Sequence, residues 1–312
     1  MKVTGRLLVL CAAAALFGVS CSINKLAIDA VASSLSAGGA GGNTFTSDDD
    51  PILVGQALPF AMKLFETLLS QDPKNSALAL QTGSLFVMYA NAYVQTPAEM
   101  LPDAEFQRQS AMLARAKELY LRGRKYVLQG IEDRHPGFEA ALDDAKGGAL
   151  ADQLAMMKRG DVPYLFWAAA GWMGAYAINP LDFNLAITIK TPLAMMAEAE
   201  HLDSGFDQGA IHEFYLSYDA AAPESLGGGL EKAREEYALA LKYSKGKRAS
   251  VYVAYAQAIA VRDHDPEAFR KALEKALAID PNADRANRLA TIIAQNQARW
   301  LLAHIDDYFL SP

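Results

Sequence analysis

The stretch "FRKALEKALAIDP", Phe269 to Pro281, repeats a spacing that occurs much earlier in the chain, in "FAMKLFETLLSQDP", Phe60 to Pro73. In each stretch an apolar residue follows a bulky residue by three positions, and a proline follows the apolar residue by five positions. These residues are Leu273, Ala276 and Pro281 in the first stretch and Phe65, Leu68 and Pro73 in the second. Apolar side chains at this spacing predict an amphipathic helix, and the proline predicts where the helix ends. Recurrence of the same helix with the same end indicates a repeated structural unit.

The second helix of a tetratricopeptide repeat has this pattern: a small residue, a bulky residue four positions later, alanine after three more and proline after five more. Tyr237 and Leu273 lie 36 residues apart, close to the usual period of about 34 residues. The chain is therefore expected to contain a degenerate array of helical hairpins. The matching positions are Ala61, Phe65, Leu68 and Pro73; Met196, Ala199 and Ser204; Ala233, Tyr237 and Ala240; and Phe269, Leu273, Ala276 and Pro281.

The first helices of such hairpins are less distinct. "WAAAG", Trp167 to Gly171, has an aromatic and a small residue four positions apart, whereas residues 76–93 and 248–261 are apolar helices without that signature. The β-like run "LAITI", Leu185 to Ile189, is expected in a connection, because breaker residues flank it. We expect an all-α, tetratricopeptide-like superhelix with a concave binding surface. Helix pairing between residues 102 and 163 stays open, since the repeat signal fades there.

Composition limits the class of partner. The chain has 312 residues, 52% of them hydrophobic, and a formal charge of −7, so it can bury a large core. No block of lysine and arginine is present that could follow a phosphate backbone. Nucleic acid is therefore not expected as a partner.

The N-terminus has the features of an export signal. Lys2 and Arg6 precede the apolar run 7–20, and "LFGVSCS" around Cys21 is similar to a bacterial lipobox, although Gly18 stands where leucine is usual. We expect residues 1–20 to be a signal peptide and Cys21 to be lipidated. The alternative is an ordinary signal peptide that leaves Cys21 as a free thiol. Lipidation is favoured because Cys11 would be removed with the signal, which leaves Cys21 without a disulfide partner.

Residues 21–50 are expected to form a lipidated N-terminus and flexible linker, since residues 36–42 are mostly glycine. Three aspartates, 48–50, then precede Pro51. Aspartate is favoured at a helix N-cap and proline in the first turn, so this run predicts a helix start. A calcium-binding loop is the alternative. The helical-repeat domain is expected to cover residues 51–312.

Several segments together resemble the TatT component family of tripartite ATP-independent periplasmic (TRAP) transporters. They are "SDDDPILVGQALPFAMKLFETLLSQDP" from Ser47, "DSGFDQGAIHEFY" from Asp203, "GGGLEKAREEYALAL" from Gly227, "FRKALEKALAIDP" and "LATIIAQNQARWLLAHIDDYF" from Leu289. The resemblance implies a non-enzymatic, periplasm-facing lipoprotein of the bacterial envelope that forms a homotrimer. It also implies association with the periplasmic substrate-binding subunit of a TRAP transporter and a cavity for a small hydrophobic or organic-acid ligand. The alternative function is a helical-repeat scaffold of an envelope assembly complex, such as one for outer-membrane β-barrels.

No catalytic or metal-binding motif stands out. The five histidines are 135, 201, 212, 264 and 304, and none has another four positions away, so "IHEFY" around His212 is not a metalloprotease motif. We expect no catalytic residues, no metal and no cofactor, and interpret His212 as a structural or partly buried histidine. Adjacent acids such as Asp306 and Asp307 point about 100° apart on a helix, which is typical of a solvated face.

Aromatic residues supply the candidates for a ligand-binding wall. In "PYLFWAAAGWMGAYAI", from Pro163, they recur at four-residue spacing, and "EFYLSYD" beside His212 offers polar aromatic groups. Ligand cavities are lined mainly by apolar and aromatic side chains with a few polar ones. An ordinary core stripe is the alternative interpretation. The candidates are Tyr164, Trp167, Trp172, Tyr176, His212, Tyr215 and Tyr218.

Overall fold

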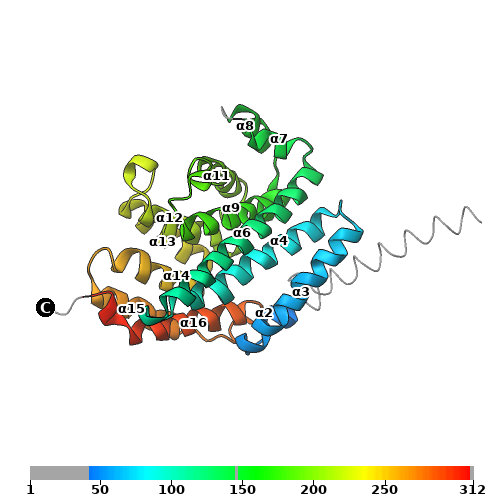
Figure 1. Cartoon of the computed structure of the whole chain (residues 1–312). Helices are drawn as coiled ribbons and strands as arrows, with labels where there is room; N and C mark the ends of the chain where they lie inside the picture. Colours follow the sequence, from blue (N-terminus) through cyan, green and yellow to red (C-terminus); the bar gives the residue numbers. More distant parts are fainter. Residues whose placement is uncertain (1–41, 145–146, 310–312) are drawn as a thin grey trace, which may run out of the picture.

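The computed structural model describes residues 42–144 and 147–309 of the chain, and all regular elements in those residues are helices (Figure 1). The expected all-α class is confirmed. The predicted signal peptide and Cys21 lie outside the described residues. The last part of the expected linker is described, and it contains the short helix α2, Gly42–Thr46.

Helix α3, Pro51–Gln71, begins where the aspartate run predicts. The side chain of Asp50 accepts hydrogen bonds from the backbone N–H groups of Ile52 and Leu53, at 2.9 and 3.0 Å, and Pro51 occupies the first turn. These bonds satisfy amides that have no partner inside the helix. The "SDDDP" run is therefore a helix cap in this structure.

Helix α4, Ser76–Ala90, continues through the π-helical turn η1, Asn91–Gln95, into α5, Thr96–Glu99. After the 3-10 turn η2, Asp103–Glu105, the chain forms the longest helix, α6, Phe106–Arg134. This helix packs against α4 and α9. These contacts answer the question of helix pairing between residues 102 and 163, which stayed open from the sequence.

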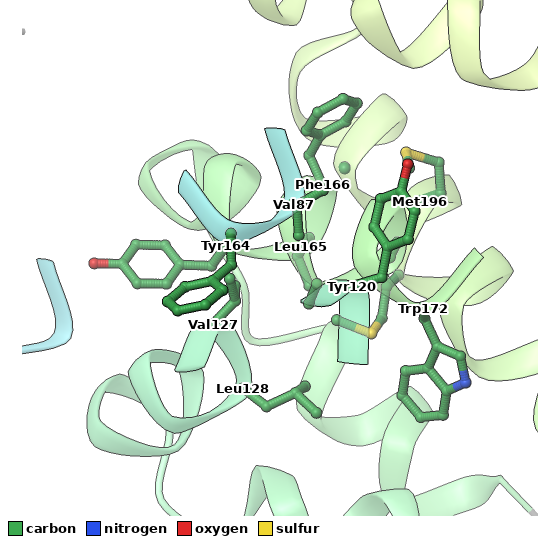
Figure 2. Packing of buried hydrophobic residues seen from close by; sticks show 14 of the residues in the cluster. Val87, Tyr120, Val127, Leu128, Tyr164, Leu165, Phe166, Trp172 and Met196 are labelled. Atoms are coloured by element: carbon green, nitrogen blue, oxygen red, sulfur yellow. The ribbon is translucent and has the colours of Figure 1, made fainter. Parts of the chain in front are cut away.

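The middle of the chain packs around helix α9, Val162–Ile178, which contacts both α6 and α11. Figure 2 shows aromatic side chains of α6 and α9 meeting aliphatic side chains in this core. The run 185–189 forms no strand; it overlaps α10 and the turn after it, as expected for a connection. The surrounding elements are α7 Phe138–Leu142, α8 Gly148–Leu154, η3 Arg159–Asp161, α10 Phe183–Ala186 and α11 Lys190–Asp203.

The C-terminal part has further helices and a core of its own, built around Phe269 and Leu273, neither of which is exposed to solvent. Helix α12 packs against α13, and α15 packs against both α14 and α16. The elements are η4 Phe206–Gln208, α12 Ala210–Ala221, η5 Glu224–Leu226, α13 Leu230–Ser244, α14 Ala249–Tyr255, η6 Ala256–Ala260, α15 Pro266–Leu277, η7 Arg285–Asn287, α16 Arg288–Ala303 and η8 Ile305–Asp307.

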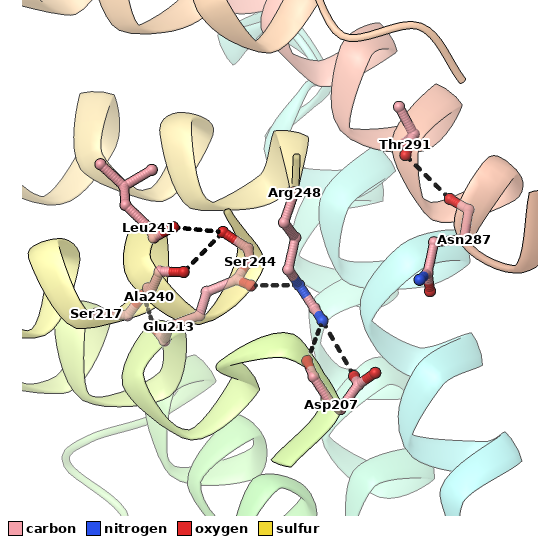
Figure 3. Close-up of polar contacts among 9 residues, drawn as sticks. All are labelled: Asp207, Glu213, Ser217, Ala240, Leu241, Ser244, Arg248, Asn287 and Thr291. Atoms are coloured by element: carbon pink, nitrogen blue, oxygen red, sulfur yellow. Dashed lines mark hydrogen bonds and ion pairs between the residues drawn. The ribbon is translucent and has the colours of Figure 1, made fainter. Parts of the chain in front are cut away.

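Arg248 joins α14 to the elements that precede it (Figure 3). Its Nη1 donates to the backbone oxygen of Asp207 at 2.7 Å, and its Nε lies 2.8 Å from Oε2 of Glu213. Burial disfavours the charged guanidinium, but the two carboxylates outweigh that effect and raise the pKa of Arg248. The charged side chain of Arg248 therefore connects η4 and α12 to the start of α14.

The N-terminal helices of the described chain lie beside a C-terminal one, because α2 and α3 both contact α16 (Figure 1). An ion pair joins Nη2 of Arg288 to Oδ2 of Asp49 at 2.5 Å. The helical array therefore returns to its starting point instead of extending as an open rod.

Helix α3 is the one helix among the described residues that is long and apolar enough to cross a membrane, with a window of mean hydropathy 1.4. Length and composition alone are weak evidence for a membrane span. Here one face of α3 is buried against the protein, with Val54, Leu58 and Phe65 each less than a tenth exposed. We therefore describe α3 as part of the helical array.

Candidate functional site

A hollow of about 380 Å³ lies between α3, the π-helical turn η1, α5 and α16. Its volume falls within the range of small-molecule sites, about 300–1,000 Å³. Its wall is mainly apolar, and both the N-terminal helix α3 and the C-terminal helix α16 contribute to it. The lining residues are Pro51, Ile52, Gly55, Gln56, Tyr89, Ala92, Tyr93, Thr96, Pro97, Met100, Ile293, Asn296 and Gln297.

Tyr93 brings a phenol hydroxyl to the lining of this hollow. Its hydroxyl oxygen is buried and forms no hydrogen bond with any residue that the structure describes. Burial raises the pKa of Tyr93 to about 12, with Asp48 adding to the shift. The hydroxyl thus stays protonated and is available as a donor. Tyr93 belongs to the π-helical turn η1, and such turns occur frequently at functional sites.

The aromatic candidates from the sequence do not line this hollow. Tyr164 and Trp172 are buried in the core around α9, 5% and 7% exposed. Arg134 lies over the ring of Tyr164 at 5.0 Å, and Nε1 of Trp172 donates to Oγ1 of Thr188 at 3.0 Å. A ligand-facing role for these residues stays a prediction.

The remaining candidates are half-buried, apart from His212. Trp167 meets Phe166 edge to face, with the ring centres 5.2 Å apart. Burial raises the pKa of Tyr218, and Asp219 and Tyr176 add to the shift.

His212 stands at the centre of a polar network and is only 1% exposed. Its Nδ1 lies 2.6 Å from Oε2 of Glu236, and its Nε2 lies 2.9 Å from Oγ of Ser204. The ring of Tyr243 stacks on the imidazole, with an interplanar angle of 2°. Two ring hydrogen bonds and one stacking contact fix the orientation of His212.

Further acidic groups surround this histidine. Glu200 approaches it from α11, and one ligand atom from each of Glu200, His212 and Glu236 lies within 4.8 Å of the other two. Burial raises the pKa of Glu200, and Glu236 adds to the shift. Burial likewise raises the pKa of Asp219 to about 6, and it raises the pKa of Tyr215, with Glu200 adding to that shift. The site concentrates negative charge in a poorly hydrated place.

Ser204, His212 and Glu236 are also connected in sequence by hydrogen bonds of the lengths found in a serine–histidine–acid triad. Sequence analysis missed this constellation because the three residues share no motif. Two features count against hydrolysis. Ser204 caps the C-terminal end of α11, where carbonyl oxygens oppose a developing oxyanion. The hollow described above also lacks Ser204 among its lining residues.

Two comparisons place the chain among known proteins. A family model described as "TRAP transporter T-component" matches residues 47–309. An uncharacterized protein of Treponema pallidum (strain Nichols) is 39% identical to this chain over 266 residues, which cover 85% of this chain and 82% of that protein.

Proposed function

The chain belongs to the TRAP transporter T-component family, and from that membership we propose that it is a non-enzymatic accessory component that binds the periplasmic substrate-binding subunit of its transporter. The observation that carries this proposal is the family match, which extends over nearly all the described residues. The all-helical array supports it, because helical-repeat proteins are typically binding scaffolds.

The same proposal includes the location and assembly of the protein. We propose a lipoprotein of the bacterial envelope that faces the periplasm, is anchored through Cys21 and forms a homotrimer. The lipobox-like sequence around Cys21 supports the anchor. Acyl chains on one cysteine can hold a protein stably at a membrane.

For the docking surface we propose the N-terminal half of α3 beside the hollow. Ile52, Leu53 and Phe60 are 73%, 56% and 75% exposed, and their spacing places them on one side of the helix. A stripe of large apolar side chains next to a hollow is typical of an interaction site. The hollow itself is proposed to hold a small hydrophobic or organic-acid ligand, with the Tyr93 hydroxyl donating to it.

A binding assay with the substrate-binding subunit from the same organism tests the proposal. The full-length protein in detergent is immobilised, and the affinity for the purified subunit is measured for the parent and for Phe60→Asp. A charge within the stripe is expected to weaken binding at least tenfold, because it would have to be desolvated in the complex.

Leu181→Asp is the matched control, since Leu181 is 93% exposed in the turn between α9 and α10 and is not part of the stripe. If both variants bind the subunit with the affinity of the parent, the α3 surface is not the docking site. If the parent does not bind the subunit, the proposed role in transport is wrong. Light scattering of the same samples identifies the remaining outcome. If Phe60→Asp dissociates an oligomer and leaves subunit binding intact, the stripe lies between copies of this chain.

A further inference from the structure

We propose that Glu200, His212 and Glu236 form a binding site for a divalent transition-metal ion of the Zn²⁺ class. The three residues come from the successive helices α11, α12 and α13. Imidazole nitrogen and carboxylate oxygen are both ordinary Zn²⁺ ligands. This proposal departs from the expectation from the sequence, where His212 had no partner at metal-binding spacing.

The distances are compatible with a bound ion after small movements. Zn²⁺ holds nitrogen and oxygen ligands at about 2.0–2.2 Å, which separates neighbouring ligand atoms by about 3.3 Å in a tetrahedral site. The three ligand atoms here lie within 4.8 Å of one another. Glutamate side-chain rotations can close the wider separations and open the 2.6 Å contact between His212 and Glu236.

The surroundings of the imidazole fit a metal ligand. We assign Nδ1 as the ligand atom, because it faces Glu236. Nε2 then carries the proton and donates to Oγ of Ser204, 2.9 Å away. Metal-binding histidines commonly donate their second N–H in this way, which fixes the tautomer. Stacking on Tyr243 holds the ring in the same orientation.

Glu200 supplies the second argument. Its carboxylate forms no hydrogen bond or ion pair with any residue that the structure describes, although it faces both His212 and Glu236. Asp219 and Tyr215 add further acidic groups nearby, and Lys232 is the cation that acts on Asp219. A divalent ion would neutralise this excess of negative charge. Three protein ligands leave a fourth position open.

Calorimetric titration with Zn²⁺ tests the site directly. The full-length protein, with an affinity tag that contains no histidine, is purified in detergent, treated with EDTA and freed of the chelator. We expect one Zn²⁺ per chain. Glu200→Gln is expected to weaken binding at least tenfold, and Ser204→Ala about tenfold through the lost orientation of the imidazole.

Glu235→Gln is the matched control, because Glu235 is exposed beside Glu236 and loses the same charge. Thermal melts of each variant without metal show whether it is folded. If Glu200→Gln does not fold, the absorption spectrum of the Co²⁺-loaded parent and of Ser204→Ala provides the second measurement. Absence of one-to-one binding, or equal affinity in Glu200→Gln and Glu235→Gln, would overturn the proposal and leave His212 with a purely structural role.

Discussion

At Gly83 helices α4 and α6 approach too closely for any side chain. A Cβ atom there would lie 2.5 Å from the carbonyl oxygen of Gly123 and 2.4 Å from a methyl group of Val127. The backbone oxygen cannot move without displacing the whole of α6. We therefore predict that Gly83→Ala lowers the free energy of unfolding by about 2–3 kcal/mol or more, measured by urea denaturation.

Gly160→Ala provides the comparison for that measurement. The nearest atom to an added Cβ at Gly160 is a terminal nitrogen of Arg134 at 3.8 Å, so this change is expected to be close to neutral. Similar losses in both variants would mean that α4 and α6 do not pack through their glycines.

Asp219 is predicted to make stability depend on pH. Burial raises its pKa to about 6, above the value of about 3.9 in an unfolded chain. A carboxyl with a raised pKa favours the folded state while it is protonated, so its contribution is present below about pH 4 and is lost as the pH rises through about 6. Asp219→Asn should be more stable than the parent near pH 7, by about 1 kcal/mol after allowance for solvent screening.

Urea denaturation in EDTA at about pH 4 and about pH 7 checks this prediction. The difference between Asp219→Asn and the parent should vanish at the lower pH. Glu235→Gln, at an exposed position on α13, is the comparison for the loss of one carboxylate. An Asn variant that differs from the parent equally at both pH values would contradict the assignment to the Asp219 carboxyl.

At the scale of the elements, helix ends could be predicted from the sequence, because caps act locally. Asp265 accepts from the N–H of Ala268 at 2.8 Å and precedes Pro266, in the same way as Asp50 precedes Pro51. Lys245 stands five positions after Ala240, where the repeat pattern has proline. Helix α13 therefore ends in a different way. Lys245 adopts a left-handed conformation, and the N–H of Gly246 donates to the oxygen of Leu241 at 2.9 Å, as in a common helix-ending motif.

Irregular turns within helices could not be predicted from periodicity. Apolar spacing runs smoothly through residues 76–93 and 248–261, yet the structure inserts the π-helical turns η1 and η6 near the end of each. A π-helical turn changes the backbone hydrogen bonds and shifts which side chains face the core. For this reason the position of Tyr93 at the hollow could not be predicted from apolar spacing.

The candidate sites depend on contacts between helices that are distant in the sequence. Sequence analysis singled out His212 and Tyr215, which share α12, but it missed Glu200 and Glu236 on the neighbouring helices. Trp172 was a candidate for a ligand-binding wall or for an ordinary core stripe; the structure packs Arg124 over its indole at 4.4 Å and buries it, and the ligand-facing role stays a prediction. Local patterns identify which residues are unusual, and only the packing shows which residues they meet.

At the scale of the whole molecule, the helices surround two main cores. The larger includes α4, α6, α9 and α11, and the other lies between α14, α15 and α16. In helical-repeat proteins each unit is stabilised mainly by its neighbours, so different regions can open separately. Arg248 and the contact of Asp49 with Arg288 link the two regions through charged groups, and a small apolar cluster that includes Leu216 and Ile259 joins α12 to η6. The Asp49–Arg288 pair, whose carboxylate is exposed, is expected to contribute only about 0–1 kcal/mol.

We therefore predict that the C-terminal core opens independently of the larger one. Phe269 is fully buried there, against Tyr308 and Phe309, and Phe269→Ala should cost about 3–5 kcal/mol. Hydrogen exchange followed by mass spectrometry should show faster exchange in α14, α15 and α16 and unchanged exchange in α4 and α6. Phe86→Ala, in the larger core, should give the reverse pattern. If either variant accelerates exchange in all helices equally, the array unfolds as one unit, and the closure between α2 and α16 is strong enough to couple both cores.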